Sequence, residues 1–244
     1  SSGIVNVASG ATFNLNNGTF AFNSGSSITG AGTVQVSGGT ATFAGGATNS
    51  AKIALTGGTA TFSGTTSTSG GGSFTGGTLN GTGTLTLAGA LAISGGDLSG
   101  TGTINANGGA NLTNSFNLHG GQTLALAGNS TWSGGNINQG GGALLTNAGN
   151  FTTTANNSMS YGYAGTKLAF TNSGTFTKTT ATGDSYLDAS LVNTGTVDVQ
   201  SGSVSIGGGG SSSGIVNVAS GATFNLNNGT FAFNSGSSIT GAGT

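Results

Sequence analysis

The chain carries almost no charge, and this scarcity excludes several classes of function. Its 244 residues contain three lysines, four aspartates and one histidine, with no arginine or glutamate, for a net charge of −1. Three lysines are too few to neutralise the phosphates of a nucleic acid. General acid–base chemistry also has few residues on which to draw.

Cysteine and proline are both absent. Without cysteine the chain forms no disulfide and offers no thiolate to a metal. The absence of proline is typical of strands hydrogen-bonded along both edges, because proline cannot donate to a ladder. No run approaches the roughly 18 apolar residues of a membrane helix, and no signal peptide is visible. Since the chain does not begin with methionine, we interpret it as a piece of a longer protein.

Glycine is abundant instead, with 52 residues, and apolar residues make up 34% of the chain. Glycine, threonine, serine and asparagine all form helices poorly, which disfavours a helical protein. Disordered chains usually combine high charge with few aromatic or β-branched residues. Here 13 phenylalanines are placed regularly, so the composition indicates an all-β fold.

Short internal repeats support this interpretation. VQVSGGTATF at 34–43 is echoed by IALTGGTATF at 53–62, and GGTLNGTGTLTLAG at 76–89 is echoed at the same spacing by GGDLSGTGTINANG at 95–108. Each phrase predicts two alternating strands joined by a glycine corner.

Ten such two-strand units can be laid along the chain. They begin at Val5, Val34, Ile53, Leu85, Ile104, Leu124, Ala143, Leu168, Val197 and Val216. Eight or nine residues later each has a large apolar residue, namely Phe13, Phe43, Phe62, Ile93, Leu112, Trp132, Phe151, Phe176, Ile206 and Phe224. Five of the spacings between successive starts are nearly equal, and the four that begin at Val5, Ile53, Ala143 and Leu168 are longer.

This pattern predicts a parallel β-helix (β-solenoid) of roughly 9–11 rungs, in which stacked coils bury one continuous apolar stack. The strong preference of parallel crossovers predicts a right-handed coil. The longer spacings carry either a third wall or loops that stand away from the coil. Because charged pairs are nearly absent, we expect stability to depend little on salt or on pH between about 4 and 9.

Residues 212–244 repeat residues 1–33 without a single difference. We therefore expect residues 1–211 to be one complete solenoid copy and residues 212–244 to be the start of the next. Solenoids normally end in polar caps, and neither GIVNV nor SITGAGT resembles one. The ends are thus expected to be uncapped, in a fold that continues.

The phrases GAGTVQVSGGTATF at 30–43, NTGTVDVQSGSVSI at 193–206 and VNVASGATFNL at 5–15 resemble the β-strand repeats of bacterial surface exoproteins of the autotransporter and filamentous haemagglutinin-like adhesin type. The resemblance covers essentially the whole chain. It implies a secreted or cell-surface fibre and no catalytic residue. The low charge and the identical duplication depart from it, and they suit a uniform shaft better than an adhesive tip.

The sequence offers no convincing catalytic, cofactor-binding or metal site. Asp184 and Asp188 are the only acidic pair, expected on a solvated loop, because calcium sites usually gather more oxygen ligands. Asp97 stands alone, and His119 is expected at a surface turn with no acid beside it. Trp132 occupies the phenylalanine slot of its unit and is expected in the core.

We therefore expect a structural filament or adhesin shaft that is extracellular and not an enzyme. Its partners would be coaxial copies of itself and surface polysaccharide, without nucleic acid or membrane insertion. Two alternatives remain open, a polysaccharide-active β-helix enzyme and an ice-binding solenoid. The latter needs flat threonine ladders. Outward threonines at 40, 42, 59 and 61 begin such a ladder, which we expect to fail at Ala90, Ala92, Asn111, Ser203 and Ser205.

Overall fold

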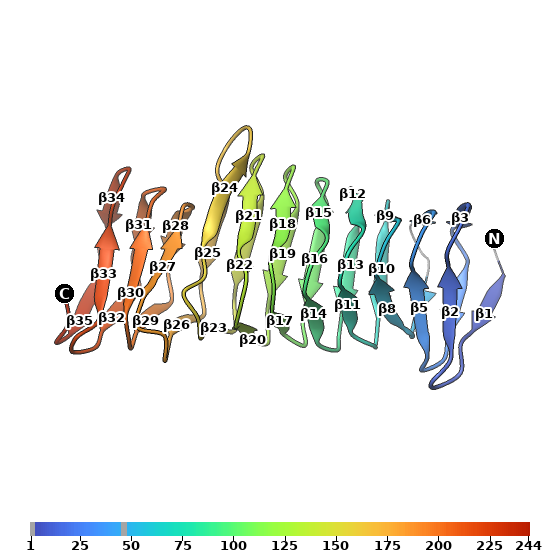
Figure 1. Ribbon diagram of the computed structural model, residues 1–244, viewed down its shortest axis with the longest axis horizontal. Coiled ribbons are helices and arrows are strands. Elements are labelled where there is room, and N and C mark those ends of the chain that lie inside the picture. Colours follow the sequence, from blue (N-terminus) through green and yellow to red (C-terminus); the bar gives the residue numbers. More distant parts are fainter. Residues whose placement is uncertain (1–2, 45–47) are drawn as a thin grey trace.

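Three parallel sheets wind together into one coil in the computed structural model, which describes residues 3–44 and 48–244 (Figure 1). The described residues form about 12 turns and contain no helix, and therefore none that spans a membrane. Each turn contributes one strand to each of three walls, which we name A, B and C. The predicted parallel β-solenoid is confirmed.

Each wall stacks its strands in the order of the chain. Wall A has 12 strands: β1 (Ile4–Asn6), β4 (Ser27–Thr29), β7 (Thr48–Asn49), β10 (Thr65–Thr68), β13 (Thr84–Leu87), β16 (Thr103–Ala106), β19 (Thr123–Leu126), β22 (Leu144–Asn147), β25 (Ala169–Asn172), β28 (Ser190–Asn193), β31 (Gly210–Ser212) and β34 (Phe231–Phe233). Wall B has 12: β2 (Thr12–Leu15), β5 (Thr33–Val36), β8 (Lys52–Leu55), β11 (Gly72–Phe74), β14 (Leu91–Ile93), β17 (Ala110–Leu112), β20 (Asn129–Trp132), β23 (Asn150–Thr153), β26 (Thr175–Lys178), β29 (Thr196–Val199), β32 (Ile215–Val218) and β35 (Ser238–Gly241). Wall C has 11: β3 (Thr19–Phe22), β6 (Thr40–Phe43), β9 (Thr59–Phe62), β12 (Thr78–Gly81), β15 (Asp97–Ser99), β18 (Phe116–His119), β21 (Ile137–Gly140), β24 (Met159–Tyr163), β27 (Asp184–Leu187), β30 (Ser203–Ile206) and β33 (Thr223–Leu226).

Strand alternation decides which side chains enter the coil. In β13 Leu85 and Leu87 are buried, whereas Thr84 and Thr86, which alternate with them, face outward. Leu85 lies in register with Ile104 of the next turn, and Ile104 with Leu124 of the turn after it. Like residues therefore stack along the axis, and burial of each stabilises the fold by about 1.5–3 kcal/mol.

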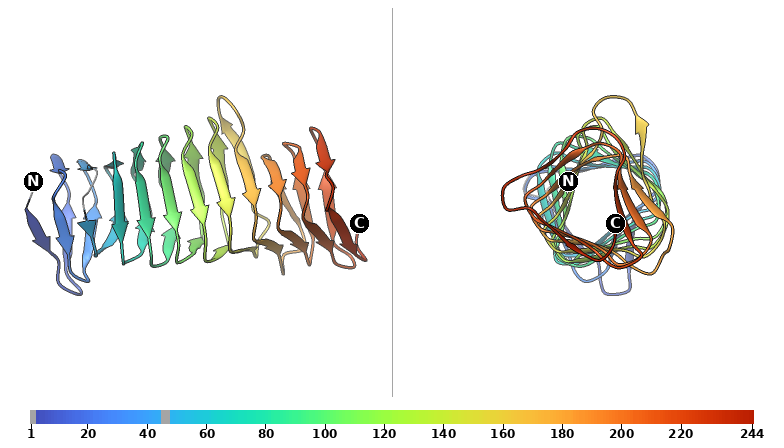
Figure 2. Two further views of the ribbon diagram at one scale, coloured as in Figure 1. Left: turned by 180° about the vertical axis from the view of Figure 1, so that it is seen from behind. Right: turned by 90° about the vertical axis from the view of Figure 1, so that its left-hand side faces the viewer.

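Aromatic residues form separate stacks on two walls, so the expectation of one apolar stack is wrong in this detail. On wall C the Phe43 ring lies 5.0 Å from that of Phe22 and 4.8 Å from that of Phe62, all nearly parallel. On wall B the Phe151 and Phe176 rings lie 5.5 Å apart. Both stacks belong to one apolar core, filled from all three walls. Figure 2 shows the three walls around the axis of the coil in its end-on view.

The corner between walls B and C requires glycine. Gly39, Gly58 and Gly77 all have φ between 63° and 73°, a conformation that other L-residues rarely adopt. The corners also stack tightly, since a Cβ on Gly58 would lie 2.6 Å from the carbonyl oxygen of Gly39. The SGG and TGG phrases are therefore corners for both conformational and steric reasons.

The long spacings in the sequence have two origins. Val5 and Leu85 lie on wall A, whereas Val34 and Ile53 lie on wall B. The spacings from Val5 to Val34 and from Ile53 to Leu85 therefore run from a strand of one wall to a strand of another, and do not measure one turn. TTSTSGGGSFTGGTLNG contains the ordinary strands β10, β11 and β12. The third wall thus exists in every turn, which gives about 12 turns rather than 9–11. NNSMSYGYAGTK, by contrast, lies in a turn that is longer, with Leu144 paired to Ala169.

Phe62→Asp tests the core. The substitution places an unpaired carboxylate among buried rings, and we expect a loss of on the order of 5 kcal/mol in the free energy of unfolding. Thr59→Asp on the same strand is the control, because Thr59 faces outward in a column that already contains Asp97. Urea unfolding of both variants provides the measurement. Equal losses would contradict the inward assignment of Phe62.

Candidate functional site

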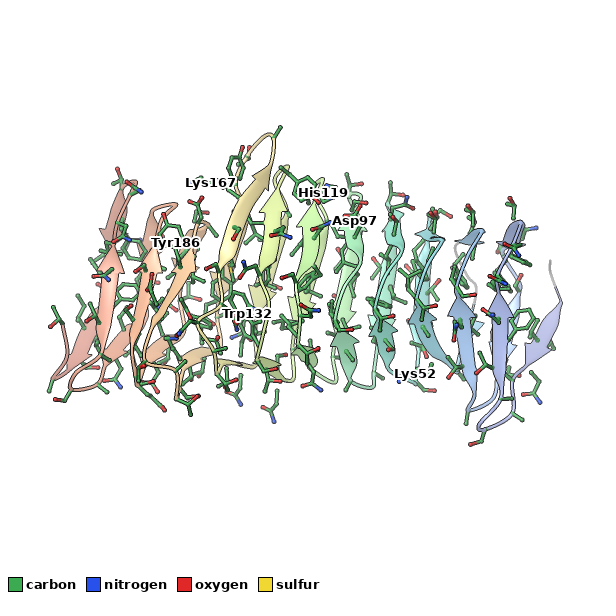
Figure 3. The ribbon with its side chains drawn as sticks, in the orientation of Figure 1. Lys52, Asp97, His119, Trp132, Lys167 and Tyr186 are labelled. Atoms are coloured by element: carbon green, nitrogen blue, oxygen red, sulfur yellow. The ribbon has the colours of Figure 1, made fainter. Side chains whose placement is uncertain are left out.

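Half of the lysine, aspartate and histidine residues gather on one side of the coil, beside two of the three tyrosines. Asp97, His119, Tyr161, Tyr163, Lys167 and Asp188 make up this group, which we call the ridge. Figure 3 shows Asp97, His119 and Lys167 along the same side of the solenoid. Elsewhere the described outer faces carry mainly threonine, serine and asparagine.

An acid–histidine pair forms one end of the ridge. The Nε2 atom of His119 lies 2.6 Å from Oδ1 of Asp97, and both side chains are partly exposed. Asp97 on β15 pairs with Asn117 on β18, so His119, two residues further on, extends from the same outer face. The expectation of a histidine without a neighbouring acid is therefore wrong. The sequence separation of Asp97 and His119 could have predicted this contact. It equals one turn plus two residues, which places both side chains on the same outer face in neighbouring turns.

Tyr163 covers this pair from two turns away. Its ring stacks on the His119 ring, with centroids 3.9 Å apart and an angle of 12° between the planes. The intervening strand β21 ends in Gly140, which pairs with Tyr163, and a Cβ at Gly140 would lie 2.7 Å from that of Tyr163. Burial raises the pKa of the Tyr163 hydroxyl, and the Asp97 carboxylate raises it further.

Strand β24 and the protruding loop that follows it form the other end of the ridge. The register between β21 and β24 shifts after Gln139, so Gly162 is an extra residue, and such bulges re-aim neighbouring side chains. Tyr161 is 41% exposed and donates a hydrogen bond to the carbonyl of Gly165. In Figure 1 the loop after β24 stands above the other turns.

Lys167 joins this loop to the following turn. Its Nζ atom lies 2.5 Å from Oδ1 of Asp188 and 5.7 Å from the centroid of the Tyr161 ring. Asp188 follows β27 directly and contacts Lys167, so the expectation of a merely solvated loop residue is wrong for it. Asp184 is exposed at the start of β27, where its carboxylate accepts hydrogen bonds from Ser203 and Ser205. The two aspartates therefore have separate partners.

The bulge in β24 and the loop after it interrupt wall C, and a buried glutamine bridges the gap. Strand β24 pairs with β27 through Met159 and Leu187 alone. Gln139 is fully buried, accepts a hydrogen bond from the backbone N–H of Leu168, and donates one to the carbonyl of Asp188. These two hydrogen bonds satisfy backbone groups that have no strand partner where β24 and β27 are not paired.

Lys178 points into the coil, which the sequence analysis did not predict. It occupies an inward position of β26, fully buried, between Thr153 below and Val199 above. Its Nζ donates to Oγ of Ser185 at 3.1 Å and to the carbonyl of Ala155 at 3.2 Å. Burial lowers the pKa of the Lys178 ammonium group, and the Asp184 carboxylate opposes this shift. The sequence does indicate this position, because Lys178 lies two residues after the buried Phe176 on the same strand and so faces the same way.

An asparagine ladder lines the corner between walls A and B. Asn147, Asn172 and Asn193 are buried one above another, and each Nδ2 donates to the next side-chain oxygen or to a strand carbonyl. Asn172 donates to Oδ1 of Asn193 at 2.8 Å and to the carbonyl of Thr196 at 2.9 Å. The phrases TNAGNF, TNSGTF and VNTGTV carry this ladder in the sequence.

Trp132 is fully buried and donates from Nε1 to the carbonyl of Gly135, so its prediction as a core residue is confirmed. In the described part of the chain no three histidine, cysteine, aspartate or glutamate residues are grouped to hold a metal, and no pocket is present.

The threonine ladder is longer than expected in one column. Thr19, Thr40, Thr59 and Thr78 lie in register on wall C. The neighbouring column reads Ala21, Thr42, Thr61 and Asn80, so two turns carry the threonine pair. Ala92 and Asn111 lie on wall B and are not neighbours of this ladder, contrary to expectation.

Comparison of the chain with protein-family models, with curated proteins and with solved structures finds no match.

Lys178→Met tests the buried lysine. Because its pKa is lowered in the folded state, the unfolded chain binds more protons between that pKa and the ordinary value of 10.5. Stability of the parent protein should therefore rise with pH across this interval, by at most about 1.4 kcal/mol per pH unit. The variant should lose this slope.

Urea unfolding at several pH values from neutral to about 10 measures the slope. Lys52→Met, at an exposed position on β8, is the matched control and should keep it. The Lys178→Met variant should still fold, since Ser185 also donates to the Ala155 carbonyl. A slope unchanged in Lys178→Met would assign the pH dependence to another group.

Asn172→Ala tests the ladder. It leaves the carbonyl of Thr196 and the side-chain oxygen of Asn193 without this donor, and unsatisfied buried groups cost about 1–3 kcal/mol each. We expect thermal or urea unfolding to show a loss of about 3 kcal/mol. Thr171→Ala, on the outer face of β25, should change stability by less than about 0.5 kcal/mol. Similar losses in both variants would contradict a specific role for the ladder.

Proposed function

We propose that the protein is part of the shaft of an extracellular filament or surface adhesin, built from 211-residue solenoid copies that continue one coil. The observation that carries this proposal is the join at residue 212, where the sequence begins its second identical passage. Strand β31 crosses the join and pairs with β28 below it.

The join has the bonding of any other turn. Asn193 Nδ2 donates to Oγ of Ser212 at 3.1 Å, and the N–H of Ile215 donates to the carbonyl of Gly195 at 2.8 Å. Val216 and Val218 stack on Val197 and Val199 of the preceding turn. A second copy thus begins without a linker, and bonding between turns favours a stiff rod over separate domains.

The outer surface suits a shaft as well. Outward threonine, serine and asparagine side chains offer many hydrogen-bond donors and acceptors with almost no net charge. Such walls can approach neighbouring fibres or polysaccharide without charge repulsion. The resemblance to surface exoprotein repeats favours an extracellular location.

Electron micrographs and denaturing electrophoresis of the native assembly test the proposal. We expect long unbranched filaments, an axial advance of about 50 Å per copy at about 4.8 Å per turn, and chains far larger than 22.9 kDa. A single band near 22.9 kDa from native material would refute covalent tandem copies.

Activity assays on the purified chain separate the alternatives. A monodisperse monomer that inhibits ice growth would replace the shaft with an ice-binding function, for which the wall C threonine column would be the surface. Cleavage of a polysaccharide, lost in His119→Ala, would replace it with an enzyme that uses the Asp97–His119 pair.

A further inference from the structure

The two identical passages of the sequence lie on different walls. Residues 4–6 form β1 on wall A, whereas their equivalents 215–217 belong to β32 on wall B. The shift persists through the segment, since Thr12–Leu15 lies on wall B and Thr223–Leu226 on wall C. The same amino-acid sequence therefore forms strands on wall A in one copy and on wall B in the next.

The local structure of the two passages is nevertheless the same. Ile4 pairs with Ser27, and its equivalent Ile215 pairs with Ser238. Even a side-chain bond is reproduced: Oγ1 of Thr29 donates to Oδ1 of Asn6 at 3.2 Å, and Oγ1 of Thr240 to Oδ1 of Asn217 at 3.0 Å. The pairing register of the repeated passage is therefore set by its own sequence and is the same on either wall.

The strand count explains the shift. From β1 to β32 the chain advances 31 strands, which is ten turns of three strands and one strand more. We infer that successive 211-residue copies are offset by one wall, a third of a turn, so that three copies are needed to bring a feature back to its original wall. For copies beyond the one that begins at residue 212, this inference rests on the proposed function.

The offset determines how the shaft presents its ridge. One copy carries the ridge on one side, at β24 and the loop that follows it. This loop stands out from the coil in the end-on view of Figure 2. The next copy presents the same residues one wall further round, about 50 Å along the axis. A filament therefore displays Tyr161, Lys167 and the Asp97–His119 pair toward three directions, and a neighbouring fibre or surface meets them from any side.

Disulfide trapping within the present chain tests the offset. Asp198 and Asn217 lie in register on wall B, and Nδ2 of Asn217 is 2.7 Å from Oδ1 of Asp198. Since the chain has no native cysteine, Asp198→Cys with Asn217→Cys should oxidise within the monomer in high yield. A second pair, Thr196→Cys with Ile215→Cys, uses the same two strands and avoids the loss of that hydrogen bond.

Two control cysteine pairs test the opposite arrangement, in which successive copies place the same residues on the same wall. Strand β32 would then lie on β28 of wall A, and Val192→Cys with Asn217→Cys, or Ser190→Cys with Ile215→Cys, would oxidise instead. Circular dichroism confirms that each variant folds. Cross-linking of the control pairs in place of the wall B pairs would overturn the offset.

A second measurement follows the offset along the fibre. Ala164→Cys, exposed on the loop after β24, takes a gold label, and cryo-microscopy of labelled fibres assigns each label to a wall. We expect labels on walls in rotation, with a return at every third copy. Labels on one wall throughout would overturn the inference. If no fibres exist, the proposed function fails, whereas the disulfide result still decides the offset at residue 212.

Discussion

Hydrogen bonding along the axis is the constraint on which the rest of this molecule depends. Every interior strand is paired on both edges, so each residue is fixed opposite a residue of the turn below and of the turn above. Inward leucines and phenylalanines therefore form columns, asparagines form a ladder, and glycine corners lie directly on glycine corners. Where the ladder is broken, at β24 and β27, the buried amide of Gln139 supplies the missing partners.

The class of fold could be predicted because a single turn cannot bury its own apolar face. The alternation of VQVSGGTATF and IALTGGTATF, the regular spacing of such echoes and the missing proline all depend on that requirement. The number of walls could not be predicted in the same way. All three walls share the same in–out alternation and similar glycine corners, so Val34 on wall B resembles Leu85 on wall A. The two-strand units assigned from alternation alone therefore begin on wall A in some turns and on wall B in others.

The ridge and Lys178 were harder to predict from the sequence, for a different reason. Contacts between turns depend on register, and a bulge at Gly162 changes that register by one residue. The stacking of Tyr163 on His119 also requires glycine at position 140 of the intervening turn, because a Cβ there would lie 2.7 Å from the Cβ of Tyr163. Lys178 was overlooked because lysine rarely lies inside a protein, although its position in β26 alternates with Thr177 as a core residue would.

The pairing of each turn to its neighbours also has a mechanical consequence. Tension along the axis pulls directly on the hydrogen bonds between turns, and the end turns have a neighbour on one side only. A turn that detaches releases a whole rung of chain, such as the stretch from Thr84 to Thr103. When drawn out, a rung of this length spans roughly 65 Å, against the roughly 4.8 Å that the turn occupied in the coil. A loaded rod of this construction therefore lengthens by releasing single turns from an end, which limits the peak force transmitted to whatever it holds.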